Sequence, residues 1–126
     1  ITICRFSYGM RMYNVTFPGG VAVDVAVNGQ AIHTDQDGSA PTPFQLFLAS
    51  IASCAGFYAL RFCQERQIPT EGLAVTMTHE ANKMAISVTT PPEFPEKYRE
   101  ALLRAVDHCK VKQAIADRPV FDVKVA

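Results

Sequence analysis

The sequence predicts an α+β fold: an antiparallel β-meander, a long buried central helix, a β-hairpin, a second helix pair and a final strand. Two patterns and the chain length carry this prediction. Apolar residues alternate with polar ones in several short segments, as they do in half-buried strands. Residues 44–60 are instead apolar or small all the way round the expected helix, which is typical of a helix buried inside a fold. Because 126 residues is the length of one domain, we assign residues 1–126 to a single domain.

The first three strands are expected at residues 10–17, 21–27 and 31–34, where β-branched and aromatic residues alternate with polar ones. The segments between them, Pro18-Gly19-Gly20 and Asn28-Gly29, are typical of tight turns. Side chains two residues apart on a strand share a face. The middle strand therefore has an apolar face made of four valines: Val21, Val23, Val25 and Val27.

The long helix is expected to begin at a capping box. Thr42 supplies the capping hydroxyl, Pro43 fits the first helical position, and Gln45 stands three residues after the cap. The helix should run to about Arg66 and end before Ile68-Pro69, since a residue that precedes proline resists the helical conformation. Residues 43–60 carry no charge over eighteen positions, so a membrane span is the competing interpretation. We favour a core helix, because alanine and serine make this segment only mildly hydrophobic.

The second half of the chain predicts a hairpin, two helices and a strand. Residues 73–80 and 84–90 alternate around Asn82-Lys83, and Pro95 opens a helix. The helical pattern breaks at residues 107–109 and restarts as a short helix over residues 111–115. Residues 120–125 alternate again and predict the last strand, which gives the order β-β-β-α-β-β-α-α-β.

Composition excludes several classes of function. Twelve basic residues balance twelve acidic ones and there is no tryptophan, so we expect no nucleic-acid partner. The beginning of the sequence lacks the pattern of a signal peptide, and four scattered cysteines are typical of cytoplasmic thiols rather than of a disulfide framework. The three histidines show no metal-ligand spacing with one another or with cysteine. We expect no metal and no cofactor.

The sequence gives no chemical role to two of the four cysteines, Cys63 and Cys4. Cys63 follows Cys54 by nine positions on one helix, which places the two on opposite faces and about 13.5 Å apart along the axis. They cannot form a disulfide with each other. Cys63 lies near the end of the helix beside Phe62, so we expect a core residue. Cys4 stands in an apolar first segment, and its role is open.

Cys54 has room beside its sulfur, because small residues surround it in the sequence: Ser50, Ser53, Ala55 and Gly56. It lies too far into its helix to gain from the N-terminal dipole, so a lowered pKa requires a cation that the fold brings near. The candidates are Arg61 on the same helix face and, through folding, Arg5 and Arg11. For Arg61 we slightly favour the alternative of a solvated side chain.

Cys109 has the local sequence that most favours a thiolate, because it begins a short helix and stands among His108, Lys110 and Lys112. Two such thiols fit a peroxidatic and resolving pair, in which a peroxide oxidises one cysteine to a sulfenic acid and the other condenses with it. A structural role for a buried cysteine such as Cys54 is the commoner case. From the residues alone, both interpretations remain open.

Three segments resemble the OsmC/Ohr superfamily, the osmotically inducible protein C and organic hydroperoxide resistance proteins. Residues 40–56, APTPFQLFLASIASCAG, resemble its signature helix, and residues 107–112, DHCKVK, its second cysteine box. Residues 67–73, QIPTEGL, resemble its link from helix to strand. The resemblance implies that Cys54 is the peroxidatic cysteine and Cys109 its resolving partner, in an intertwined homodimer with active sites at the dimer interface. The implied substrate is an organic hydroperoxide, and a dithiol resets the disulfide.

The resemblance fails at two positions. The peroxidase branch has a glutamate where Phe44 stands, and that glutamate pairs with an arginine in the first hairpin, near Val21. Neither member of this pair carries over. Asp35, ahead of the helix, is open between orienting an interface cation and closing an Asx turn.

Two other classes of function are therefore weighed beside the redox enzyme. One is a non-catalytic module that binds a small apolar ligand beside Cys54, for which Phe44 in place of a charged residue is the cue. The other is a purely structural dimer module, which nothing in the placement of the cysteines favours.

Overall fold

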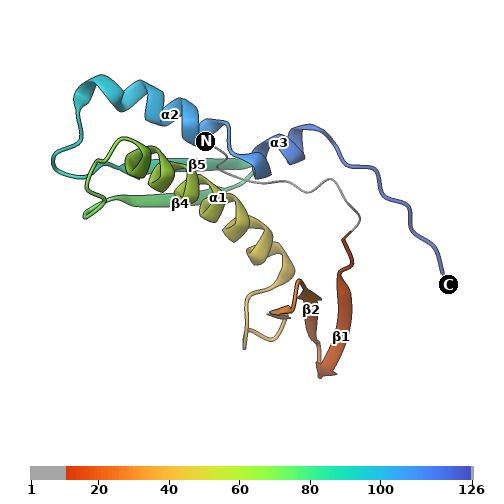
Figure 1. Ribbon diagram of the computed structural model, residues 1–126. Helices are drawn as coiled ribbons and strands as arrows, with labels where there is room; N and C mark the ends of the chain where they lie inside the picture. The colour runs from red at the N-terminus through yellow and green to blue at the C-terminus, as the bar shows by residue number, and fades with distance from the viewer. Residues whose placement is uncertain (1–10, 126) are drawn as a thin grey trace. The chain divides into compact units, whose positions relative to one another are not determined.

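The computed structural model describes residues 11–125, and it confirms an α+β fold built of antiparallel strands and helices (Figure 1). The predictions for Cys4 and Arg5 lie outside the described residues. By its internal contacts the chain divides into one compact unit up to Ala49 and another from Ser50. The elements follow the predicted order except at the C-terminus. The strands are β1 (Asn14–Gly19), β2 (Ala22–Val27), β3 (Gln30–Asp35), β4 (Ala74–Glu80) and β5 (Lys83–Thr89). The helices are α1 (Pro43–Glu65), the short 3₁₀ helix η1 (Glu96–Tyr98), α2 (Arg99–Asp107) and α3 (Lys110–Ala116).

The first unit contains the predicted meander, an antiparallel sheet in the order β1-β2-β3. Val25 pairs with Val15 on one side and with Ile32 on the other, so the predicted apolar face is continuous across the sheet. This face is thinly covered within the described chain. Every residue of β1 is exposed, Phe17 at 77%. A sheet that leaves so much apolar surface uncovered is typical of an interface.

Helix α1 begins at the predicted capping box. The Thr42 hydroxyl accepts a hydrogen bond from the Gln45 backbone N–H at 3.1 Å, and the Gln45 side-chain oxygen accepts one from the Thr42 N–H at 3.0 Å. Two backbone donors that the first turn leaves without helical partners are thereby satisfied. The capping residues therefore fix where α1 starts, and with it the register of every side chain along the helix.

The other end of α1 is closed by a Schellman motif. The Ile68 N–H donates to the Cys63 carbonyl at 2.9 Å and the Gln67 N–H to the Gln64 carbonyl at 3.1 Å. Gln67 takes the left-handed conformation, with φ at 56°. The helix thus ends at Glu65, before Ile68-Pro69 as predicted, and Ile68 turns back into the core at 8% exposure.

The expectation that α1 is buried on all sides is wrong for the described chain. Only one face of it is buried: Ile51, Ala55, Ala59, Phe62 and Cys63. The phenylalanines of the other faces are exposed, Phe44 at 56%. By length and composition α1 could cross a membrane, with a mean hydropathy of 1.6 over eighteen residues, of which 28% are buried. A core helix passes the same test, and the buried face of α1 packs as such a helix does.

The core of the second unit forms where α1, α2 and the β4–β5 hairpin meet (Figure 1). Ala55, Ala59 and Phe62 of α1 pack with Leu102 and Val106 of α2. The hairpin register places the inward side chains in facing pairs, Val75 with Val88 and Met77 with Ile86. Its other face is polar, with Thr76 opposite Ser87. A two-stranded hairpin is marginal alone, so the two helices are what hold it.

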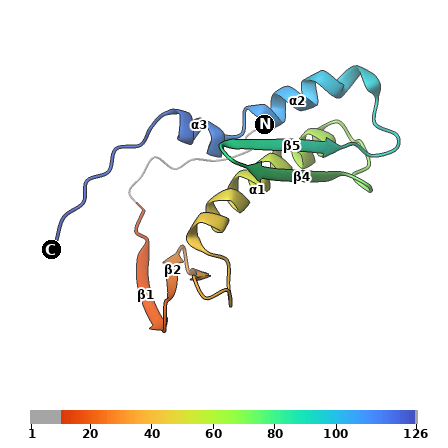
Figure 2. The ribbon, with the colours of Figure 1, turned by 180° about the vertical axis from the view of Figure 1, so that it is seen from behind.

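The predicted break between the last two helices is confirmed, and the predicted last strand is wrong. Helix α2 ends at Asp107, and α3 begins at Lys110 after His108 and Cys109. Residues 118–125 contain no helix or strand, and they leave α3 as an extended segment (Figure 2). Its apolar side chains are almost fully exposed, Phe121 at 81% and Val125 at 99%. The pattern of a strand is present, but no neighbouring strand of the described chain pairs with it.

We expect the Thr42→Ala substitution to lower the free energy of unfolding by about 1 kcal/mol, because it removes the capping acceptor at the start of α1. Thr42→Ser keeps a hydroxyl at the cap and should stay close to the parent protein. Urea unfolding monitored by circular dichroism measures both. Equal losses for the alanine and serine variants would contradict the capping role.

Candidate functional site

The site is built around two sulfurs that come from distant parts of the chain. A side-chain hydrogen bond joins the thiols of Cys54, on α1, and Cys109, between α2 and α3. Both residues belong to the second compact unit. Cys54 is half-buried and Cys109 is fully buried, and neither is in a disulfide. Of the two, Cys54 is therefore the sulfur that a molecule from solution reaches first.

Local structure explains how each sulfur is placed. Cys54 precedes Ala55, which is fully buried against α2, so it lies at the edge of the buried face of α1. Cys109 is the residue before α3, with an extended ψ of 144°. Its N–H donates to the Val106 carbonyl at 3.3 Å and its carbonyl accepts from the Gln113 N–H at 3.2 Å. The break between the helices thus turns the Cys109 side chain inward to meet α1.

The fold opposes the thiolate that the local sequence of Cys109 favours. Burial of Cys109 raises the pKa of its thiol above the ordinary value, and the nearby thiol of Cys54 raises this pKa further. The backbone N–H and the ammonium of Lys112 act in the opposite direction, although no regular capping hydrogen bond forms. The net direction is upward, so Cys109 rests as a neutral thiol at neutral pH.

Of the three cationic neighbours that the sequence offered to Cys109, Lys112 is the one whose charge acts on it. The Lys112 ammonium donates to Asp107 Oδ1 at 2.6 Å, and the pair bridges the break between α2 and α3. This contact lowers the pKa of Asp107 below its ordinary value. His108 points back along α2, with Nδ1 2.9 Å from the Arg104 carbonyl.

The arginines proposed as partners for Cys54 have other contacts. The Arg61 guanidinium donates to the Gln64 side-chain oxygen at 2.9 Å, and that contact is exposed, as the solvated alternative predicts. Arg11 donates to the Asn28 side chain at 3.1 Å in the first unit. Arg66 lies over the Phe62 ring at 3.6 Å and donates to the Phe62 carbonyl. Arg66 was not among the proposed partners, and the two described candidates, Arg61 and Arg11, thus make their contacts with amide side chains.

Cys63 is the core residue that the sequence predicts. It is fully buried, and this burial raises the pKa of its thiol, with a smaller opposing effect from Arg66. Asp35 closes an Asx turn, because its Oδ1 accepts from the Asp37 N–H at 2.8 Å. Hydrogen bonds from Ser39 and from this N–H lower the pKa of Asp35. Among residues 11–125, no ion pair of Asp35 with a cation supports the other alternative.

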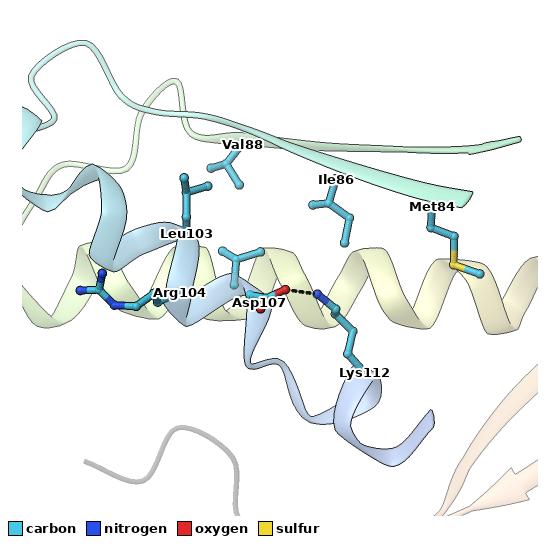
Figure 3. A pocket seen from close by; sticks show the side chains of 8 residues that line it. Met84, Ile86, Val88, Leu103, Arg104, Asp107 and Lys112 are labelled. Atoms are coloured by element: carbon cyan, nitrogen blue, oxygen red, sulfur yellow. Dashed lines mark hydrogen bonds and ion pairs between the residues drawn. The ribbon is translucent and has the colours of Figure 1, made fainter. Parts of the chain in front are cut away.

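An open groove lies beside the site, between β5 and the two C-terminal helices (Figure 3). Met84, Ile86 and Val88 of β5 line it from one side, with Val88 facing Leu103 of α2, while Asp107 and Lys112 meet across its other side. Its volume is about 470 Å³. A smaller adjoining hollow of about 240 Å³ shares Met84, Ile86 and Lys112 and reaches Ile51 on α1. Lys112 thus links the groove to the sulfur pair.

Within residues 11–125, no three His, Cys, Asp or Glu side chains are close enough together to hold a metal ion. The two positions where the resemblance fails are both open to solvent. Phe44 is 56% exposed and lies against Phe47, with 5.9 Å between the ring centroids, and Val21 is 51% exposed. The surface near the start of α1 is therefore apolar where the peroxidase branch has a charged pair.

The family model of the OsmC-like proteins matches residues 36–124, which include both cysteine boxes. The chain belongs to the OsmC-like protein family. No curated protein matches it significantly.

Solved structures agree with this family in fold. One is a protein from Psychrobacter arcticus 273-4 described as an osmotic stress induced and detoxification response protein. Its TM-score is 0.66, and it is 22% identical over 87% of this chain and 91% of that one. Another is from Legionella pneumophila, an organic hydroperoxide resistance protein OsmC described as a predicted redox protein, with a TM-score of 0.52 and 19% identity over the same shares. At these identities the likeness shows the OsmC-like fold.

The raised thiol pKa values predict a loss of stability in alkali. Above pH ~8.5 the unfolded chain releases thiol protons that the folded chain keeps, so the free energy of unfolding should fall as pH rises further. Cys63→Ala removes one of these thiols and should make that fall shallower. Urea unfolding of the reduced protein between pH 7 and pH 10 measures it.

Ala59→Gly is the matched control, because it weakens the same buried face of α1 without removing a thiol. It should lower stability by a similar amount at every pH. If the free energy of unfolding falls equally steeply with pH in the parent and in Cys63→Ala, the raised pKa of Cys63 is not a cause of the fall.

Proposed function

We propose that this OsmC-like protein is a thiol-dependent peroxidase or a related thiol–disulfide redox enzyme that works through Cys54 and Cys109. The observation that carries the proposal is the hydrogen bond between the two thiols, one half-buried and one fully buried. Two thiols that are already neighbours while reduced need little rearrangement to form a bond. The resemblance of both cysteine boxes to the family supports the same pair of residues.

Their exposures suggest which sulfur reacts first. Cys54 is the one that a hydroperoxide can approach, so it attacks the peroxide and becomes a sulfenic acid while an alcohol leaves. Cys109 then attacks the sulfur of this sulfenic acid. The S–S bond forms, the S–O bond breaks, and the oxygen leaves as water. A dithiol reductant next attacks the disulfide and returns both thiols, and free thiols of this kind fit a cytoplasmic setting.

The apolar surface at Phe44 and Val21 predicts a slow first step. An arginine there would donate hydrogen bonds to the departing oxygen of the peroxide, and losing one such donor costs about 2.7–4 kcal/mol, or roughly two to three decades of rate. Reaction with hydroperoxide should therefore be measurable but slow, while exchange with dithiols and disulfides is unaffected by this loss.

Adding one equivalent of cumene hydroperoxide to the reduced protein tests the proposal. The intact mass should decrease by two hydrogens, because a disulfide forms within one chain, and this decrease should be absent from both Cys54→Ser and Cys109→Ser. Mass spectrometry under denaturing, non-reducing conditions measures it over minutes to hours.

Cys63→Ser is the matched control, since it removes another buried thiol of the same helix, nine residues after Cys54. It should still lose two hydrogens. A parent protein whose thiols remain unchanged, or whose loss persists in Cys109→Ser, would overturn the proposal.

We further propose that the working form is a homodimer. Its support is the uncovered apolar surface of strand-forming segments, on β1 and on residues 120–125. In the extended C-terminal segment Phe121, Val123 and Val125 share one face, and no strand of the described chain pairs with it. A second copy can cover both surfaces, which a lone chain in water would not leave open.

Replacing Phe121 and Val123 together with serine should convert the dimer into a monomer, because apolar contact with the second chain is lost. Lys124→Ser, on the opposite face of the same segment, should leave it a dimer. Sedimentation velocity at micromolar concentration measures both. A parent protein that sediments as a monomer would contradict the proposal.

The second candidate is a module that binds a small apolar ligand and performs no chemistry. The exposed Phe44–Phe47 pair favours it. It predicts that Cys54→Ala preserves cellular function and that Phe44→Asp abolishes it. The redox enzyme predicts the loss of function with Cys54→Ala.

A further inference from the structure

Lys112 brings a positive charge to both a carboxylate, that of Asp107, and the thiol of Cys109. It follows Cys109 by three residues in the first turn of α3, and its ammonium is held by Asp107 across the helix break at 2.6 Å (Figure 3). The Lys112 side chain is 34% exposed, whereas that of Asp107 is 73% exposed. The carboxylate therefore holds the ammonium from the solvent side, at the edge of the groove.

We propose that Lys112 is a positioning residue that sets how readily Cys109 forms and releases its bond to Cys54, and that Asp107 opposes it. This inference rests on the proposed function, because it concerns the same two sulfurs. The positive charge of Lys112 stabilises the thiolate of Cys109, and the negative charge of Asp107 draws the ammonium away and partly cancels it.

The thiolate of Cys109 is needed in both directions of the cycle. When the disulfide forms, Cys109 loses its proton to water and its thiolate attacks Cys54 Sγ; the hydroxide displaced from the sulfenic acid takes up a proton. The oxidant is the hydroperoxide already consumed at Cys54. When a dithiol attacks Cys54 Sγ of the disulfide, Cys109 leaves as a thiolate and is then protonated. A charge that favours this thiolate assists both steps.

Burial makes this charge important. Cys109 is fully buried, and both its burial and the Cys54 thiol raise its pKa. Among the groups that act on it, Lys112 alone lowers that pKa. His108 is turned to the Arg104 carbonyl, and the side chains that β5 presents to this groove are apolar: Met84, Ile86 and Val88. Arg104 also lines this groove, but among residues 11–125 Lys112 is the cation whose charge acts on Cys109 and offsets the cost of ionising it.

Two substitutions separate this role from a structural one, because each breaks the same ion pair. Lys112→Gln removes the charge that favours the thiolate, so it should slow disulfide formation at neutral pH. Asp107→Asn leaves the Lys112 charge uncancelled, so it should speed the reaction. Each tenfold change in the thiolate fraction of Cys109 changes the rate about threefold while the thiol is mainly protonated, because nucleophilicity changes in the opposite sense. Lys112→Arg should restore the rate of the parent.

The test follows disulfide formation by stopped reaction and mass spectrometry from pH 6 to pH 10, after cumene hydroperoxide has oxidised Cys54. The profile of Lys112→Gln should move to higher pH and that of Asp107→Asn to lower pH. Rates that change in the same direction in both variants, or in neither, would overturn the inference, since a purely structural ion pair acts in that way.

A second measurement does not depend on peroxidase activity. In a protein that carries Cys109 alone, with Cys4→Ser, Cys54→Ser and Cys63→Ala, thiolate absorbance against pH reports its ionisation, and the Cys109→Ser version of it supplies the baseline. Opposite shifts for Lys112→Gln and Asp107→Asn support the inference even if the parent fails to react with hydroperoxide, which would overturn only the proposed function. Coincident titrations would overturn the inference whatever the parent does.

Discussion

The contact between the Cys54 and Cys109 thiols is the interaction on which the site depends, and it exists because a helix breaks in the right place. If α2 continued through residues 107–109, the side chain of Cys109 would follow the helical period. The break at His108 and Cys109 instead releases the backbone into an extended conformation and turns this side chain toward α1. The capping box at Thr42 fixes the register of α1 from the other side. Two local features of backbone geometry thus bring together sulfurs that are far apart in the sequence.

The same geometry gives the two sulfurs different access to solvent. Cys54 lies at the edge of the buried face of α1, where a small molecule can reach it, and Cys109 is enclosed. Enclosure protects a thiol from direct oxidation but makes its thiolate costly. Lys112, which is paired with Asp107 at the rim of the groove, lowers the cost of forming this thiolate. The reactivity of Cys109 therefore depends on how far the charge of Lys112 offsets the cost of burying its thiolate.

Much of the fold could be predicted from local sequence, because the signals are local. The Thr42–Gln45 box, the Ile68-Pro69 stop and the alternation about Asn82 each act within a few residues, and the elements formed where they indicated. The predicted strand over residues 120–125 and the all-round burial of α1 failed for one reason. Both depend on neighbours that the described chain does not supply. Alternation shows which face of a segment is apolar, but it does not show what covers that face.

The candidate site could be predicted only in part. The residues alone left Cys54 open between core packing and a redox pair with Cys109, and the resemblance to the OsmC family was what favoured the pair. The ionisation of Cys109 could not be predicted from local sequence, because the charges beside it in the sequence favour a thiolate while its burial opposes one. Of its flanking cations, His108 turns to a carbonyl, whereas the charge of Lys112 acts on the sulfur. Which neighbour in sequence becomes a neighbour in space depends on the helix break.

The adjacency of the two sulfurs can be measured without any peroxide, by equilibrating the protein with glutathione buffers of graded redox potential and mapping the products by peptide mass spectrometry. The account predicts one two-electron transition that links Cys54 to Cys109 within a chain, with a midpoint independent of protein concentration. Stable glutathione adducts on Cys54, with Cys109 still a free thiol at every potential, would contradict it.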